Sequence, residues 1–241
     1  MEKLKTVSLK FKIIAFAVFS VIGAGIVVNT TIKNNAIQNS DALVVNNKTK
    51  LTANKSEEIE KQIIKENEIK KQQQIKQKQE DLEKKWKIGY DQFFKKEYKL
   101  AIETERQVIK EDPNFYKAYA VEGIALAYNK DFIKGIEQID QALKLKPNYG
   151  YARFNKALAN ELYGHYDEAI KWYKKALEVE KFEWSYYGIA SIYGRKGVIK
   201  NTINYLKLAI DINPNVKNEA KNEKDFDNVR DSIEFRKLIE K

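Results

Sequence analysis

The side chains that most often carry enzyme chemistry are scarce in this chain. Its 241 residues include a single histidine, His165, and no cysteine. These counts exclude thiol nucleophiles, disulfide scaffolds, iron–sulfur clusters and metal sites built from several His or Cys side chains. No serine lies in a G-x-S-x-G turn, and neither an H-E-x-x-H pair nor a phosphate-binding loop occurs. We therefore predict a protein that is not an enzyme and has no catalytic residues, no metal and no cofactor.

Two short segments resemble ligand-binding loops, but their spacing is wrong. Gly23-Ala24-Gly25 looks like the start of a dinucleotide-binding loop, yet Val28 occupies the place of the third glycine and no β-α-β pattern follows. Asp225 and Asp227 have the spacing of calcium ligands, but Val229 stands where the next ligand belongs. Neither segment is expected to bind its ligand.

The overall composition favours helices. Gly and Pro total only 13 residues, too few for the many turns of a β-sandwich or β-barrel. The net charge is +10, but only five of the 44 basic residues are Arg, the residue that nucleic-acid-binding proteins prefer for bidentate contacts. A chain rich in Lys, Asn and Ile is typical of AT-rich coding, which favours a bacterial source.

The N-terminus has the features of a membrane-targeting segment. Residues 1–12 form a basic flank, and residues 13–32 contain no charge. Twenty helical residues span about 30 Å, the thickness of a bilayer's hydrocarbon core. The excess of Lys before the segment predicts a single-pass protein with a cytoplasmic N-terminus and its remainder outside the cell membrane. Cleavage as a signal peptide, with secretion, is the alternative interpretation.

Two further segments precede the main body of the chain. Residues 33–55 are rich in Asn, Thr and Lys without a sustained period, so we predict a flexible linker. Residues 56–81 are highly charged and lack Gly and Pro, which predicts a helix starting at Ser56. A broken heptad of isoleucines leaves two interpretations: a solvated helical spacer, which we favour, or a coiled coil that forms a weak homo-oligomer.

A repeat of 34 residues organises residues 82–214. Four amphipathic segments align when the chain is compared with itself, and they begin at Ala101, Gly135, Ala169 and Thr202. A second amphipathic run precedes each one, with a small residue in phase at Gly89, Gly123, Ala157 and Ala190. Periods of this length are typical of stacked helical hairpins. We predict two helices of about 12–14 residues per repeat, packed closely at the small residues.

Proline residues mark the ends of the repeats. Pro113, Pro147 and Pro214 share one phase, at which the third repeat has Lys181. Proline cannot continue a helix, so each should end the second helix of its repeat. Residues 215–241 follow, with an apolar stripe at Phe226, Val229, Ile233, Phe235, Leu238 and Ile239. We predict a single C-terminal helix that caps the last repeat.

This pattern resembles the tetratricopeptide repeat family, in its membrane-anchored bacterial form. The third repeat carries most of the resemblance, at Ala152, Asn155-Lys156-Ala157, Gly164, Tyr166, Glu168-Ala169-Ile170, Tyr173 and Ala176-Leu177. Departures are modest, and Glu105 stands where the first repeat should have an aromatic residue. The resemblance implies an all-α solenoid of about four repeats, in which the first helix of each repeat lines a concave groove.

The resemblance also implies which residues face a bound ligand. The family's ligand-facing positions fall on Trp86, Tyr90, Phe93, Lys117, Ala120, Ile124, Tyr128, Tyr151, Phe154, Leu158, Trp184, Tyr187, Ser191 and Arg195. A groove so rich in aromatic residues suits a peptide or protein segment with apolar anchors. The alternative for each aromatic residue is packing between repeats. The family's clamp for a C-terminal carboxylate is absent, because its places hold Trp86, Tyr90, Ile124, Tyr151 and Asn155.

Two functions from different classes are thus in competition. The first is a membrane-anchored scaffold that binds a protein or peptide partner in the aromatic groove, with no specific nucleic acid. The second is a basic surface that binds an anionic envelope polymer or nucleic acid, since residues 29–241 keep a net charge of about +7. Binding to a polyanion should weaken steeply with salt, whereas groove binding should respond little.

Overall fold

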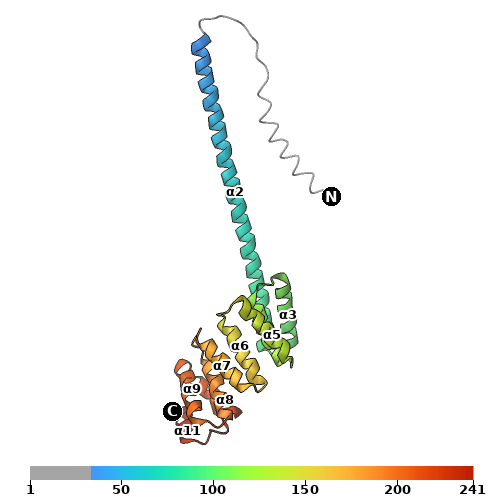
Figure 1. The fold of residues 1–241 in the computed structure, drawn as a ribbon, viewed down its shortest axis with the longest axis vertical. Coiled ribbons are helices and arrows are strands. Elements are labelled where there is room, and N and C mark those ends of the chain that lie inside the picture. Colours follow the sequence, from blue (N-terminus) through green and yellow to red (C-terminus); the bar gives the residue numbers. More distant parts are fainter. Residues whose placement is uncertain (1–33, 241) are drawn as a thin grey trace. The chain divides into compact units, whose positions relative to one another are not determined.

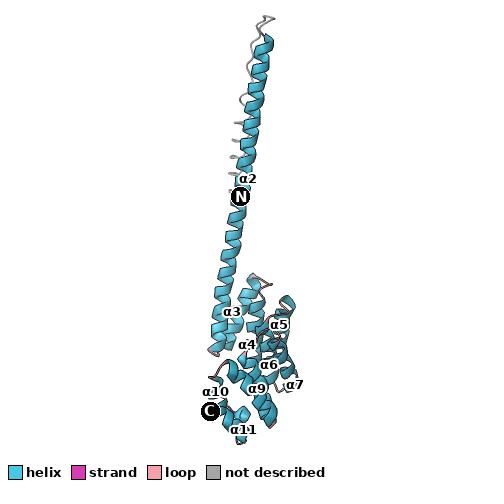
Figure 2. Cartoon of the chain, turned by 90° about the vertical axis from the view of Figure 1, so that its left-hand side faces the viewer, coloured by secondary structure: helices cyan, strands magenta, loops and turns pink. Residues whose placement is uncertain are grey.

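The computed structural model describes the backbone of residues 34–240 and the side chains of residues 55–240. Two units make up the chain, Met1–Lys70 and Lys71–Lys241. The described residues form helices and turns without any strand (Figure 2). The predicted basic flank and membrane segment, residues 1–32, lie outside the described residues. Within residues 34–240, no helix combines the length and hydropathy that crossing a membrane requires.

Helix α2 (Asn34–Phe94) contradicts the predicted linker. Residues 34–55 are helical, so the helix does not begin at Ser56 and is not interrupted before residue 82. The physical reason is that no Gly or Pro occurs between Gly25 and Gly89. Asn and Thr lower helix propensity by only a few tenths of a kcal/mol each, which weakens a helix without ending it.

Four helical hairpins follow one another in residues 82–212, as the repeat predicts. The first pairs the end of α2 with α3 (Tyr98–Glu111). The others are α4 (Tyr116–Tyr128) with α5 (Phe132–Leu145), α6 (Gly150–Leu162) with α7 (Tyr166–Leu177), and α8 (Glu183–Arg195) with α9 (Ile199–Ile212). Neighbouring hairpins pack side by side in chain order, from green α3 to orange α9 in Figure 1. The all-helical solenoid is confirmed for these residues.

The small residues lie where helices approach most closely. Ala157 and Ala190 are completely buried. A Cβ atom added to Gly123 would lie 2.7 Å from the carbonyl oxygen of Gly135, and one added to Gly135 would lie 2.7 Å from that of Gly123. Each glycine therefore allows the other helix's backbone to approach, which confirms the predicted close packing.

Three of the helices end shortly before a proline. The residues before Pro113, Pro147 and Pro214 are Asp112, Lys146 and Asn213, and their ψ angles are 97°, 86° and 101°. A proline excludes its predecessor from the helical region, so α3, α5 and α9 end one residue earlier still. Helix α7 has no such proline and is followed by the longer connection that contains Lys181.

The turn inside each hairpin requires a left-handed residue. This place is occupied in turn by Lys96 (φ 64°), Lys130 (φ 71°), Gly164 (φ 78°) and Gly197 (φ 68°). A Cβ atom makes this conformation costly, whereas glycine adopts it freely. We expect Lys130→Gly to raise the free energy of unfolding by about 1 kcal/mol in denaturant titrations. Gly164→Ala should lower it by a similar amount, and a loss on Lys130→Gly would contradict this account.

The C-terminal cap is three short elements rather than the single helix predicted. These are α10 (Val216–Asn222), the 3-10 helix η1 (Lys224–Phe226) and α11 (Ile233–Glu240). Phe226, Val229 and Phe235 are buried against the last repeat, but Ile233 is 61% exposed, so it is not part of the capping stripe. The Arg230 guanidinium donates to the carbonyls of Lys221 and Glu223, and these hydrogen bonds stabilise the break between α10 and η1.

Candidate functional site

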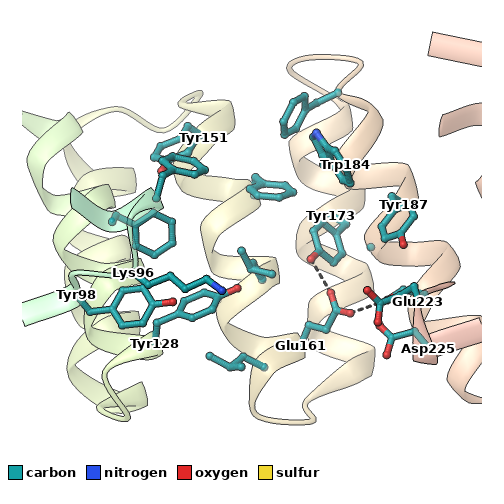
Figure 3. A pocket seen from close by; sticks show the side chains of 18 of the residues that line it. Lys96, Tyr98, Tyr128, Tyr151, Glu161, Tyr173, Trp184, Tyr187, Glu223 and Asp225 are labelled. Atoms are coloured by element: carbon teal, nitrogen blue, oxygen red, sulfur yellow. Dashed lines mark hydrogen bonds between the residues drawn. The ribbon is translucent and has the colours of Figure 1, made fainter. Parts of the chain in front are cut away.

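A groove of about 800 Å³ lies along the repeats of the unit Lys71–Lys241. The end of α2, helices α4, α6 and α8, and the C-terminal cap all contribute to its lining. Eleven of its twenty lining residues are aromatic: Tyr90, Phe93, Phe94, Tyr98, Tyr128, Tyr151, Phe154, Tyr173, Phe182, Trp184 and Tyr187. The remaining lining includes the charged residues Lys96, Glu161, Arg195, Glu223 and Asp225, and Figure 3 shows Lys96 on the opposite side from Glu223 and Asp225.

The structure brings eight of the ten principal predicted residues together. Tyr90, Phe93, Tyr128, Tyr151, Phe154, Trp184, Tyr187 and Arg195 line the groove, together with Leu158 and Ser191. Trp86 and Lys117 do not. The Lys117 ammonium pairs with Glu83 at 2.7 Å and lies 5.0 Å from the centre of the Trp86 ring, which packs near Leu82. This contact joins the first and second repeats, and neither Trp86 nor Lys117 lines the groove.

Two further positions implied by the resemblance, Ala120 and Ile124 on α4, are completely buried. Tyr90 on α2 and Tyr151 on α6 explain this difference, because their rings meet with centroids 5.8 Å apart. Phe93 and Tyr151 pack against the core cluster that contains Ala120 and Ile124. Large aromatic side chains from the flanking repeats therefore cover this part of α4.

The groove aromatics pack on one another as well as lining the surface. Phe154 contacts Tyr173 and Phe182, with ring centroids 5.6 and 5.3 Å apart. Tyr187 contacts Trp184 at 5.4 Å and Phe226 of the cap at 5.6 Å. The two interpretations given for these residues are therefore compatible. Rings held by their neighbours form a surface that needs little ordering when a ligand binds.

A polar cluster interrupts the aromatic lining between α6, α8 and the cap. Glu161 is 8% exposed and accepts hydrogen bonds from the hydroxyls of Tyr173 and Ser191, both at 2.7 Å. The Arg195 guanidinium lies 3.7 Å from Glu161 and donates to Asp225 at 2.7 Å. Burial raises the pKa of Glu161, although the two hydrogen bonds and Arg195 oppose the shift.

Several lining residues have no counterpart in the sequence prediction. Glu161 could have been found, since it follows Phe154 and Leu158 at helical spacing on α6. Lys96 and Tyr98 lie at the first hairpin turn, outside the helix positions that the family uses. Glu223 and Asp225 belong to the cap, where no repeat period applies. Figure 3 shows these side chains, with Lys96 across the groove from Asp225.

The described residues contain no group of three or more His, Asp or Glu side chains placed to hold a metal ion. The calcium-like acids have other roles, since Asp225 pairs with Arg195 and Asp227 with Arg230 at 2.8 Å. His165 is exposed, and its ring packs edge-on against Phe132 at 4.9 Å.

Helical hairpins stacked at a 34-residue period, with a groove formed by their first helices, define an α-solenoid. The sequence model of the tetratricopeptide repeat matches residues 151–182 and 185–216. The uncharacterised protein MJ0572 of Methanocaldococcus jannaschii is 39% identical over 72 residues, which are 29% of this chain and 84% of that protein. The chain therefore belongs to the tetratricopeptide repeat family.

Solved structures show the same fold. TTC0263, a thermophilic tetratricopeptide repeat protein of Thermus thermophilus, superposes with a TM-score of 0.51 at 18% identity, covering 55% of this chain and 74% of that chain. A double mutant of MamA from RS-1 has a TM-score of 0.51 at 18% identity and covers 66% and 89%.

Proposed function

We propose that this protein is a non-enzymatic scaffold that binds a peptide or protein segment in the aromatic groove. The groove itself carries the proposal: its volume of about 800 Å³ and its eleven aromatic residues offer deep apolar contact to a ligand. Aromatic side chains and Arg supply most of the binding energy at protein interfaces. The packing of Phe154 and Tyr187 against their neighbours fixes the shape of this surface before binding.

The proposal includes an anchor. The uncharged run of residues 13–32, with its basic flank, would hold the protein in the cell membrane, and α2 would act as a spacer between the membrane and the groove. This part of the proposal rests on the sequence. Protease protection of the repeats in intact cells tests it, because repeats outside the membrane are degraded by added protease while cytoplasmic repeats are not.

Substitution of two groove aromatics tests the binding function. Peptides of about twelve residues are selected on the full-length protein in mild detergent, and their dissociation constants are measured by fluorescence anisotropy. We expect Phe154→Ala combined with Tyr187→Ala to weaken binding at least about 100-fold, since each buried aromatic anchor contributes about 2 kcal/mol.

Tyr193→Ala is the matched control. Tyr193 lies on α8, like Tyr187, but it stacks on Tyr205 at 5.9 Å and does not line the groove. Circular dichroism checks that both variants keep their helices. Equal affinity of the double variant and the wild type would overturn the groove assignment. Binding of a polyanion with an affinity that falls steeply with salt would favour the basic-surface alternative instead.

A further inference from the structure

The C-terminal cap forms one end of the groove as well as covering the last repeat. Its contact with α8 is close, because a Cβ atom on Gly194 would lie 2.7 Å from the carbonyl oxygen of Asp225. Phe226 is completely buried, and the Asn228 side chain donates to the carbonyl of Arg195 at 2.7 Å. These contacts hold the segment with Glu223 and Asp225 in a fixed position beside α8.

This end of the groove has an excess of negative charge. Glu161, Glu223 and Asp225 bring three carboxyl groups to the lining, and Arg195 is the single cation of the lining at this end. Arg195 is already engaged by Glu161 and Asp225. Within the described residues, the carboxylate of Glu223 accepts only the backbone N–H of Lys224, at 3.0 Å. Lys96, the other lining cation, lies across the groove near Tyr98 and Tyr128 (Figure 3).

We propose that the groove selects protein segments that place a lysine or arginine side chain at this acidic end and large apolar side chains along the aromatic lining. The inference rests on the proposed function, which it makes more specific. A ligand cation would neutralise the charge of Glu223 and Asp225 that Arg195 leaves uncompensated. Charge-assisted hydrogen bonds to carboxylates are strong, and arginine can form two at once. A ligand carboxylate in the same place would be repelled.

Three matched peptide pools test this preference. Each peptide has about twelve residues with Leu, Phe or Tyr at fixed anchor positions, and one further position is Lys or Arg, Gln, or Glu. Binding to the full-length protein in mild detergent is measured by fluorescence anisotropy. We expect the basic pool to bind about tenfold more tightly than the Gln pool, and the Glu pool to bind most weakly.

Isosteric substitutions assign the preference to the cap. Glu223→Gln combined with Asp225→Asn should reduce the difference between the basic and Gln pools to about twofold or less. Asn can still accept a hydrogen bond from Arg195, so the cap keeps this contact. Glu234→Gln is the control, because Glu234 is an exposed acid of α11 that does not line the groove; it should preserve the tenfold difference.

The outcomes separate the two proposals. If all three pools bind equally well, and the combined Phe154→Ala and Tyr187→Ala substitutions abolish their binding, the charge preference is overturned. The groove function still stands in that case. No binding by any pool, or binding that the aromatic substitutions do not change, would contradict the groove function itself. A basic preference that survives Glu223→Gln with Asp225→Asn would also overturn the assignment to the cap.

Discussion

Replacing Glu105 with methionine is expected to raise the free energy of unfolding by about 3 kcal/mol at pH 7. Glu105 on α3 is completely buried, and neither of its carboxyl oxygens hydrogen bonds to any residue that the structure describes. The equivalent places in the later repeats hold Ile139, Tyr173 and Leu206, all buried. Methionine matches the unbranched shape of glutamate and has no charge to desolvate.

The same residue makes stability depend on pH. Burial, and secondarily the charge of Glu122, raises the pKa of Glu105 from 4.5 to about 9. The unfolded state therefore releases this proton near pH 4.5, while the folded state keeps it. Below pH 4.5 Glu105 is protonated in both states and adds no pH-dependent cost, and from there the cost to the folded state grows as the pH rises to about 9.

Urea titrations across this pH range check both expectations. The wild type should lose stability between pH 5 and pH 8, at up to about 1.4 kcal/mol per pH unit from this group, and Glu105→Met should remove that slope. Glu103→Met, an exposed position on the same helix, is the control and should preserve it. Equal slopes for the wild type and Glu105→Met would show that Glu105 is not neutral in the folded protein.

Gly123→Ala is expected to lower the free energy of unfolding by about 2 to 3 kcal/mol. The new Cβ atom would lie 2.6 Å from Cγ1 of Ile139, 2.7 Å from the carbonyl oxygen of Gly135 and 2.9 Å from the Ile139 nitrogen. Two of these are backbone atoms of α5, so the helices must move apart. The intrinsic advantage of alanine in a helix, about 1 kcal/mol, offsets only part of this cost.

Gly150→Ala provides the comparison for Gly123→Ala. A Cβ atom on Gly150, at the start of α6, would meet no atom closer than 3.7 Å. This substitution should leave stability unchanged or raise it by about 0.5 kcal/mol. Thermal unfolding of the two variants side by side is the measurement. If both variants had the same midpoint, close helix packing would not explain the small residues of the repeat.

Helix pairing in this protein was predictable because it depends on local, repeated signals. The 34-residue period placed the hairpins, and the phase of Gly123, Ala157 and Ala190 located the close helix contacts. Such signals recur in each repeat, so each copy supports the others. Residues 34–55 lack a repeat, and there the absence of helix breakers outweighed a composition typical of linkers.

The groove was only partly predictable, because it depends on how neighbouring repeats cover one another. The positions of Phe154, Trp184 and Tyr187 along their helices indicated one common face, and these three side chains line the groove. Ala120 and Ile124 share that face, but larger side chains from flanking helices cover them.

The sequence by itself determined the repeats, their helices and the aromatic character of the first-helix face, since all three follow from residue type and spacing along the chain. Only the tertiary structure decided which of those side chains remain open to a ligand, and that Glu223 and Asp225 close one end of the groove with negative charge. The apolar stripe that includes Phe226 predicted a cap, but the cap lies outside the repeat period. Its place beside α8 therefore depends on the burial of Phe226, a long-range contact.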